Sequence, residues 1–189
     1  MKKSVGQRIG FDFDKVFVNY PPFIPDALIN RLYKKSNREL SYRIPGKLEQ
    51  KIRIFSHHKI FRHPIQKNLS SFRSIVKKNN LHTFLISGRF GFLRKKTEEW
   101  LERYKLKPFF KEIYFNFDNE QPHVFKNEII RKEKIEKFID DDIDLLIYLA
   151  KENPKVEFFW LNPGNNSRTN LPQNIKMIKN LEEFFTNYL

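Results

Sequence analysis

Arg8-Ile-Gly-Phe-Asp-Phe-Asp-Lys-Val-Phe-Val18 is the stretch that decides the fold of this chain. Apolar residues lead into two carboxylates, Asp12 and Asp14, and further apolar residues follow them. An apolar run that ends in a turn predicts a buried strand whose last residues reach the edge of a sheet. Because buried carboxylates are costly without a cationic partner, we expect a cation to meet them. A divalent metal ion with a phosphate on its far side would fit.

Strand and helix patterns alternate along the rest of the chain. Four more strands are predicted at 81–86, 113–117, 135–139 and 156–161. Amphipathic helices separate them, one of them starting near Lys126. This alternation predicts an α/β fold with a mainly parallel five-stranded sheet and helices on both faces. Ligands in such folds bind beyond the carboxyl ends of the strands, so polar residues there are the candidates for a site.

Length and composition restrict the class of protein. The 189 residues, 40% of them hydrophobic, predict one globular domain or one domain with an insertion. The chain has no cysteine, which excludes a thiol nucleophile, a disulfide framework and a zinc–thiolate site. No apolar run approaches the roughly 20 residues that span a bilayer, and no apolar segment follows Lys2 and Lys3 as in a signal peptide. We therefore expect a cytoplasmic protein without a membrane partner.

The net charge of +14 is concentrated in the first part of the chain. Residues 1–110 carry 25 Lys and Arg against 8 Asp and Glu, whereas residues 111–189 carry 11 against 14. This asymmetry predicts a basic face and a phosphate-rich partner, such as a phosphorylated small molecule or a nucleic acid. A solvated lysine-rich surface explains the charge equally well, so both interpretations stay open.

A small helical insertion is predicted at residues 17–65. Pro21, Pro22 and Pro25 prevent the first strand from continuing, and Asp26 can cap a helix behind them. A second amphipathic stretch, 48–55, precedes His57 and His58. The predicted domains are thus a core of residues 1–16 and 66–189, and a cap of residues 17–65.

Polar groups of different kinds end three of the predicted strands. Asp12 and Asp14 end the first strand, Ser87 follows the second, and Asp140 with Asp141 ends the fourth. A lysine, Lys126, lies where the connecting helix would begin. Each of these residues alone is more often a turn residue, a helix cap or a solvated side chain. Together they are the parts of a phosphoryl-transfer site: a carboxylate nucleophile, a metal held by carboxylates, a hydroxyl and an ammonium.

Four segments resemble the motifs of the haloacid dehalogenase superfamily, in the expected order. Phe11-Asp12-Phe13-Asp14-Lys15-Val16 is similar to motif I, and Phe84-Leu85-Ile86-Ser87 to motif II. Lys126 fits the lysine of motif III, with Lys132 and Lys134 as alternatives, and Phe138-Ile139-Asp140-Asp141 fits motif IV. The resemblance covers about residues 8–161 and implies a Rossmann-like core.

The resemblance also implies a Mg²⁺-dependent phosphatase and a role for each residue. The metal ligands would be Asp12, Asp14 through its main-chain carbonyl, Asp140 and Asp141. Asp12 would be the nucleophile and Asp14 the general acid and base. The phosphate would be bound by Ser87, Gly88, Arg89 and Lys126. Dehalogenases of the superfamily lack an acid at the position of Asp14, because a halide leaves without a proton, so Asp14 favours a phosphatase.

The spacing of the motifs and two further sequence patterns indicate a type of cap and a subgroup within the superfamily. The 73 positions from Asp14 to Ser87 leave room for a C1-type helical cap, whose basic residues would face the phosphate. We expect His57, His58 and His63 in that cap to be surface residues. Ser87-Gly88-Arg89 and Thr97-Glu98-Glu99-Trp100-Leu101 resemble patterns of the deoxyribonucleotidase-like group, which implies a 5′-nucleotidase. The alternatives are a phosphatase for nucleic-acid ends and a non-catalytic nucleic-acid-binding protein on the same scaffold.

Overall fold

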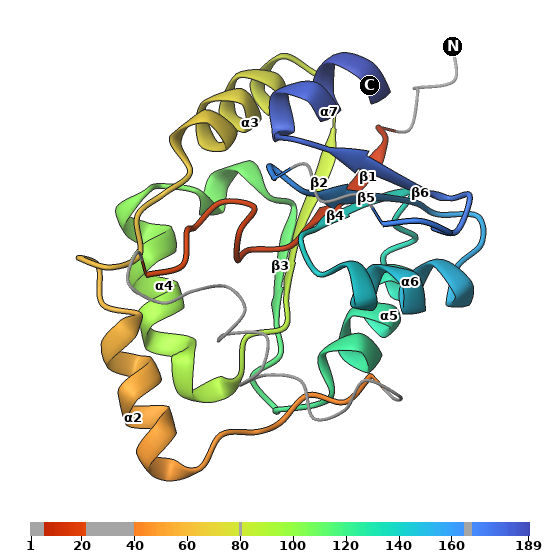
Figure 1. The fold of residues 1–189 in the computed structure, drawn as a ribbon. Coiled ribbons are helices and arrows are strands. Elements are labelled where there is room, and N and C mark those ends of the chain that lie inside the picture. The colour runs from red at the N-terminus through yellow and green to blue at the C-terminus, as the bar shows by residue number, and fades with distance from the viewer. Residues whose placement is uncertain (1–5, 22–39, 80, 165–167) are drawn as a thin grey trace.

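The computed structural model describes residues 6–21, 40–79, 81–164 and 168–189, and its centre is one parallel β-sheet (Figure 1). The strands follow the order β3-β2-β1-β4-β5-β6, and every neighbouring pair is parallel. Their bounds are β1 Arg8–Phe11, β2 His82–Ser87, β3 Glu112–Phe115, β4 Lys137–Asp140, β5 Glu157–Leu161 and β6 Ile175–Ile178. The α/β fold with a parallel sheet is therefore confirmed. The helix predicted behind Asp26 lies outside the described residues.

The sheet has six strands, so the predicted number of five is wrong. The missed strand is β6, which pairs with β5 in the register Phe158↔Ile175. It is short and half exposed, because Lys176 and Met177 are not buried while Ile175 and Ile178 are. Four residues that lie at the edge of a sheet need few apolar side chains, so their sequence pattern is weak.

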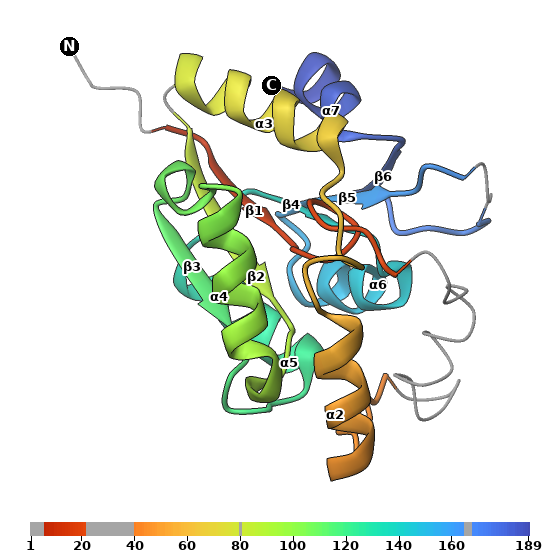
Figure 2. The same ribbon diagram turned by 90° about the vertical axis from the view of Figure 1, so that its left-hand side faces the viewer.

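Helices cover both faces of the sheet and enclose two hydrophobic cores (Figures 1 and 2). One face carries α3 (Gln66–Lys78), α4 (Arg94–Arg103) and α7 (Leu181–Tyr188), and the other carries α5 (Pro122–Lys132) and α6 (Ile143–Glu152). Two 3₁₀ turns, η1 (Gly91–Leu93) and η2 (Lys107–Phe109), flank α4. Fully buried phenylalanines supply much of both cores, including Phe11, Phe72 and Phe184 on the first face and Phe84, Phe138 and Phe158 on the second.

β1 alternates its side chains between the two cores, as a central strand should. Ile9 and Phe11 enter the first core, and Gly10 faces the second. A Cβ atom on Gly10 would lie 2.7 Å from Cδ2 of Phe138, so the close packing of that ring requires glycine. The strand is thereby fixed between its neighbours, and the residue that follows it, Asp12, is held by its own N–H on the carbonyl of Ile139 (2.9 Å).

Helix α5 begins at Pro122 and not near Lys126 as predicted. A proline is favourable in the first turn of a helix, where its missing N–H has no intrahelical partner to lose. The earlier start places Lys126 one turn inside the helix, where its side chain is held over the ends of the strands.

The described part of the predicted insertion contains helix α2 (Lys47–Ser56). Figure 2 shows α2 beyond the lower ends of the strands, outside the two helical layers. An ordinary surface helix buries its apolar residues and exposes its charged ones. Helix α2 does the opposite, because Arg53 is buried while Leu48, Ile52 and Phe55 are exposed. The division into a core and a cap stays a proposal.

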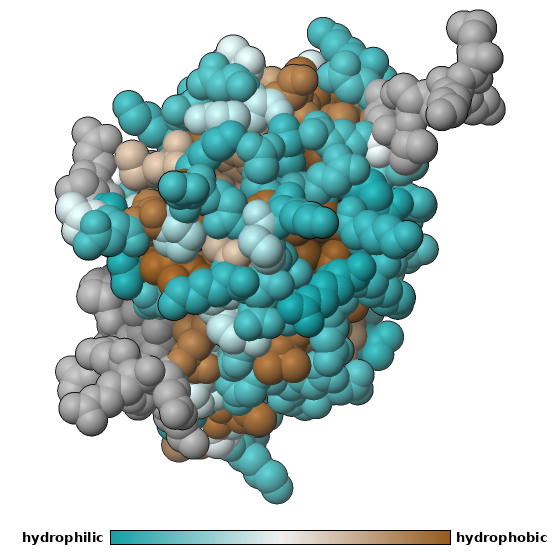
Figure 3. Space-filling view, turned by 90° about the vertical axis from the view of Figure 1, so that its right-hand side faces the viewer, coloured by the Kyte–Doolittle hydropathy of each residue, from teal (hydrophilic) through white to brown (hydrophobic). Residues whose placement is uncertain are grey.

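On the side that Figure 3 shows, apolar areas are separated by hydrophilic side chains, as expected for a chain with a net charge of +14. Among the described helices, none is both long and apolar enough to cross a membrane.

Candidate active site

The strand ends bring all of the predicted site residues to one cavity of about 120 Å³. Because β1 lies between β2 and β4, the residues that end these three strands meet at the sheet edge where the strand order reverses. The cavity is lined by each of the residues predicted from the sequence: Asp12, Asp14, Ser87, Gly88, Arg89, Lys126, Asp140 and Asp141.

Lys126 joins two of the carboxylates. Its Nζ atom donates to Oδ1 of Asp12 (2.7 Å) and to Oδ2 of Asp140 (2.6 Å), and the three side chains are almost completely buried. Burial acts to lower the pKa of Lys126, but Asp12 and Asp140 outweigh it and raise this pKa above its usual range. Lys126 is therefore a permanent cation between two acids.

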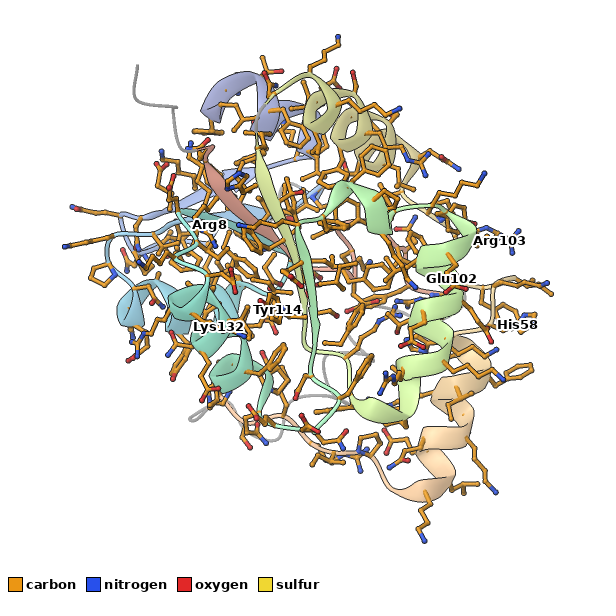
Figure 4. The ribbon with its side chains drawn as sticks, turned by 180° about the vertical axis from the view of Figure 1, so that it is seen from behind. Arg8, His58, Glu102, Arg103, Tyr114 and Lys132 are labelled. Carbon is orange, nitrogen blue, oxygen red and sulfur yellow. The ribbon has the colours of Figure 1, made fainter. Side chains whose placement is uncertain are left out.

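The other lysines considered for this position lie elsewhere. Lys132 is exposed, with its Nζ atom 5.1 Å from the centre of the Tyr114 ring (Figure 4). Lys134 follows the end of α5 in a left-handed turn (φ 48°). Neither residue lines the cavity.

A single ammonium does not neutralise the acidic cluster. Oxygen atoms of Asp12, Asp140 and Asp141 all lie within 4.8 Å of one another. Burial raises the pKa of Asp12 to about 7, against the effect of Lys126 and with that of the neighbouring carboxylates. Burial, followed by the charge of Asp140, also raises the pKa of Asp141 well above its ordinary value. The Asp141 carboxylate makes no hydrogen bond or ion pair with a described residue, so this group of three oxygen ligands fits a hard divalent cation such as Mg²⁺.

Asp14 is bound by arginines, whereas Asp12 is bound by Lys126, and the pKa of Asp14 is shifted in the opposite direction. Arg89 binds its carboxylate with two atoms, Nε on Oδ2 and Nη2 on Oδ1 (both 2.7 Å), and Arg62 also donates to Oδ1. Burial acts to raise the pKa of Asp14, but the two guanidinium groups outweigh it and hold this pKa well below its usual range. The pKa values of Asp12 and Asp14 are therefore shifted in opposite directions, upward for Asp12 and downward for Asp14, although the two residues are only two positions apart.

Helix α4 positions both of these arginines. Arg89 donates through Nη1 to Oγ1 of Thr97 (2.9 Å), and Trp100 donates through Nε1 to the carbonyl oxygen of Arg62 (2.9 Å). Thr97 is in turn held by its own hydrogen bond to the carbonyl of Leu93 (3.0 Å). The Thr-x-x-Trp pattern found in the sequence thus supports the two cations that bind Asp14.

The turns around the site explain two local features of the sequence. Lys15 adopts φ 57°, a left-handed conformation that favours glycine, and its ammonium lies 4.6 Å from the centre of the Tyr20 ring and not in the cavity. Gly88 packs under α5, because a Cβ atom there would lie 3.0 Å from Cβ of Pro122. Ser87, which precedes it, is 1% exposed and accepts a long hydrogen bond from the N–H of Arg89 (3.4 Å).

Asp142, the third acid of the run that begins at Asp140, has a structural role. Its carboxylate caps α6 by accepting from the N–H groups of Asp144 (3.1 Å) and Leu145 (3.3 Å). It also accepts from the hydroxyl of Tyr42 (2.8 Å), which ties the segment before α2 to the core.

Sequence reasoning missed a second set of cavity residues. These side chains come from the insertion and from the segment after β2: Tyr20, Tyr42, Arg53, His57, Phe90, Phe92 and Leu93. His57 is 9% exposed, so the prediction that it lies at the surface is wrong, whereas His63 is exposed as expected. A weak signal existed in the pattern of α2, where the polar residues Glu49, Arg53 and His57 recur every four positions.

No family profile and no curated protein sequence matches this chain. Several solved structures, in contrast, are similar to this chain in fold. A haloacid dehalogenase-like family hydrolase from Streptococcus pneumoniae is 12% identical with a TM-score of 0.59, over 96% of this chain and 98% of that one. A dehalogenase is 11% identical with a TM-score of 0.64, over 98% of each chain. A haloacid dehalogenase-like family hydrolase from Xanthomonas campestris is 12% identical with a TM-score of 0.58, over 94% of this chain and 92% of that one. The chain therefore has the fold of haloacid dehalogenase-like hydrolases.

Proposed function

We propose that this protein is a Mg²⁺-dependent phosphomonoesterase of the haloacid dehalogenase superfamily. The observation that carries the proposal is the buried ammonium of Lys126 between Asp12 and Asp140, with Asp141 beside them. This arrangement supplies a carboxylate nucleophile, a charged donor for phosphoryl oxygens and oxygen ligands for a metal.

Asp12 is the proposed nucleophile. Its Oδ1 atom is held by Lys126, and Oδ2 makes no hydrogen bond with a described residue. The carboxylate attacks phosphorus, the bond from phosphorus to the leaving oxygen breaks with its electron pair, and an aspartyl-phosphate forms. Water then attacks phosphorus and restores the Asp12 carboxylate. Lys126, Ser87 and the main chain at Gly88 bind the phosphoryl oxygens.

The acidic cluster is the proposed metal site. Asp12, Asp140 and Asp141 would hold Mg²⁺ with their carboxylates, and Asp14 with its main-chain carbonyl. When bound, the ion offsets the repulsion between nucleophile and phosphate and stabilises charge on the phosphoryl oxygens.

Asp14 is the proposed proton carrier. As a carboxylate it can accept a proton from the attacking water. It can protonate the leaving oxygen only after it has taken up a proton itself, for which the guanidinium groups of Arg62 and Arg89 must turn away from it. Arg89 would then be available to the phosphate, the role that its position beside Ser87 suggests.

Asp14 also favours a phosphatase over a dehalogenase. Two of the structurally similar proteins are described as dehalogenases, one of them as an L-2-haloacid dehalogenase. A halide ion leaves without a proton, whereas the alkoxide of a phosphate monoester needs one. An acid two positions after the nucleophile is therefore useful only for the second kind of leaving group.

The proposed substrate is a small phosphorylated molecule, namely a nucleotide, and the proposed activity is that of a 5′-nucleotidase. The cavity is smaller than the roughly 300 Å³ of a typical ligand pocket, so it fits a phosphoryl group and the adjoining part of its alcohol. Tyr20, Tyr42, Phe90 and Phe92 offer aromatic faces for a base. A nucleic-acid end is the second candidate, which the basic residues of 1–110 favour.

A phosphatase screen tests the proposal. The purified protein is assayed on nucleotides, sugar phosphates, 3′-phosphorylated oligonucleotides and L-2-chloropropionate, each with Mg²⁺ or with EDTA. We expect phosphate release that needs Mg²⁺ and is fastest with small nucleotides. Halide release without phosphate release would reject the phosphatase assignment. A preference for oligonucleotide ends would replace the nucleotidase assignment with the second candidate.

A further inference from the structure

His57 is a buried histidine on α2 that lines the cavity, and one of its two ring nitrogens has a defined partner. Its Nδ1 atom lies 2.7 Å from the carbonyl oxygen of Arg53. The hydroxyl of Ser56 also lies 3.3 Å from Nδ1, but it donates to the same carbonyl (2.9 Å). Because a carbonyl oxygen can only accept, we assign the hydrogen to Nδ1, which donates it to this carbonyl. This contact assigns the tautomer, and it leaves Nε2 as the nitrogen with a lone pair.

The surroundings of His57 keep the ring uncharged. Burial, followed by the charges of Arg89 and Arg62, lowers the pKa of His57 well below its ordinary value, against the opposing effects of Asp14 and of the hydrogen bond to the backbone of Arg53. At neutral pH Nε2 is therefore an acceptor. It makes no hydrogen bond with any residue that the structure describes, so its lone pair is open to a donor from a molecule in the cavity that His57 lines.

Three charged groups place His57 near Asp14, on the side of the cavity where the leaving alcohol would lie. Asp14, Arg62 and Arg89 act on His57 electrostatically, and the same two arginines bind Asp14 directly. Asp14 is the group proposed to protonate the leaving oxygen. An alcohol whose oxygen reaches Asp14 would therefore pass the imidazole of His57.

Helix α2 is built to present polar groups to the cavity. Glu49, Arg53 and His57 recur every four residues, so they share one face of the helix, and Glu49 binds Arg53 through an ion pair of 2.6 Å. The opposite face exposes Leu48, Ile52 and Phe55. A helix that only shielded the core would have the reverse orientation.

We propose that Nε2 of His57 accepts a hydrogen bond from a hydroxyl group of the leaving alcohol, so that the substrates are phosphomonoesters of hydroxylated alcohols such as nucleosides and other sugars. This inference rests on the proposed function. His57 is a specificity residue in this account, since it contacts the alcohol and not the phosphoryl group.

Matched substrate pairs test the proposal. In the first pair, thymidine 5′-phosphate is compared with 3′-deoxythymidine 5′-phosphate. In the second, 2-hydroxyethyl phosphate is compared with n-propyl phosphate, which has the same number of heavy atoms. The measured quantity is the ratio of kcat/KM within each pair. We expect the wild-type protein to prefer the hydroxylated member, and His57→Phe to reduce the preference in at least one pair by about three- to tenfold, as for one neutral hydrogen bond.

Two further variants serve as controls. His57→Gln keeps a side-chain acceptor and should retain more of the preference than His57→Phe. His58→Phe changes the neighbouring histidine, which Figure 4 shows at the periphery of the molecule on the side of α4, and should leave the ratio unchanged. Thermal unfolding of each variant checks that it is folded.

The outcomes separate the two claims. Equal ratios in wild type and in both His57 variants, or no preference in wild type, would overturn the assignment of His57 while the phosphatase proposal stands. Failure of the wild-type protein to hydrolyse any member of either pair, with or without Mg²⁺, would overturn both.

Discussion

The Nζ atom of Lys126 lies 2.7 Å from Oδ1 of Asp12, although the two residues are 114 positions apart in the chain. The contact joins a residue one turn inside α5 to the residue that ends the central strand β1. Both side chains are almost completely buried, and the same ammonium also binds Asp140. Two carboxylates thus share one fixed cation, and the third carboxylate of the cluster, Asp141, adds a negative charge that a divalent ion would offset.

Removing Lys126 should destabilise the fold. Lys126→Met leaves Asp12 and Asp140 without their partner, and we expect the free energy of unfolding to fall by about 3–5 kcal/mol near pH 8. The loss should be smaller near pH 5.5, because buried acids with raised pKa values can then be protonated. Urea denaturation measures both values. Lys132→Met, on the exposed side of the same helix, should change stability by less than about 1 kcal/mol, and an equal effect of the two substitutions would contradict this account.

Mg²⁺ affinity should rise with pH. The pKa of Asp12 is raised to about 7, so its carboxyl is increasingly protonated below that pH and must lose the proton when the metal binds. We expect binding to be roughly tenfold weaker near pH 6 than near pH 8, with proton release that calorimetry detects in buffers of different ionisation enthalpy. Asp141→Asn should weaken Mg²⁺ binding at both pH values. Asp118 is an exposed acid elsewhere, and Asp118→Asn should leave the binding unchanged. Binding that does not depend on pH would argue against this metal site.

The ion pair between Arg62 and Asp14 should stabilise the fold in a pH-dependent way. The pKa of Asp14 is lowered by folding, so its contribution is present above the unfolded-state pKa of about 4 and is lost as the pH falls through the folded-state value. Arg62→Gln should cost about 1–3 kcal/mol at neutral pH and progressively less below about pH 4. Arg94→Gln, which removes an exposed pair with Glu98, should cost less than about 0.5 kcal/mol. A cost for Arg62→Gln that stays constant down to acid pH would show that it does not arise from the Asp14 charge.

His57 should make stability fall between neutral and mildly acid pH. Its pKa is lowered by folding, so the unfolded chain binds a proton below its own pKa of about 6.5 while the folded protein does not. The free energy of unfolding should therefore decrease as the pH falls through this window, by up to about 1.4 kcal/mol per pH unit. His57→Gln should reduce this slope, and His58→Gln should not. An unchanged slope in His57→Gln would mean that His57 is protonated in the folded protein, and Nε2 would then be a donor.

The residues that the sequence predicted best are those that end strands. Asp12, Ser87 and Asp140 follow apolar runs, and the parallel order of the strands brings such residues to one edge of the sheet. Lys126 was found for the same reason, since a helix that returns over the sheet carries its early residues past the strand ends. The weaker predictions, the start of α5 and the count of strands, concern segments whose pattern is short or begins with proline.

The insertion shows what the sequence could not reveal. Arg62 and His57 are separated from Asp14 by more than 40 positions, and apart from the weak four-residue recurrence that includes His57, their local pattern does not indicate that they lie near Asp14. An apolar stripe normally predicts the buried face of a helix. In α2 the apolar residues are exposed instead, so the sequence pattern indicates the wrong face. Only the packing of α2 against η1 and the partners of its buried face identify His57 as a cavity residue.

The most direct test of the central claim is detection of the covalent intermediate on Asp12. The protein is mixed with Mg²⁺ and p-nitrophenyl phosphate, quenched in acid and analysed by intact mass and peptide mapping. We expect a phosphoryl group on the peptide that contains Asp12, its removal by hydroxylamine as for an acyl phosphate, and neither labelling nor turnover in Asp12→Asn. Turnover that persists in Asp12→Asn, or a label on any other residue, would contradict the account.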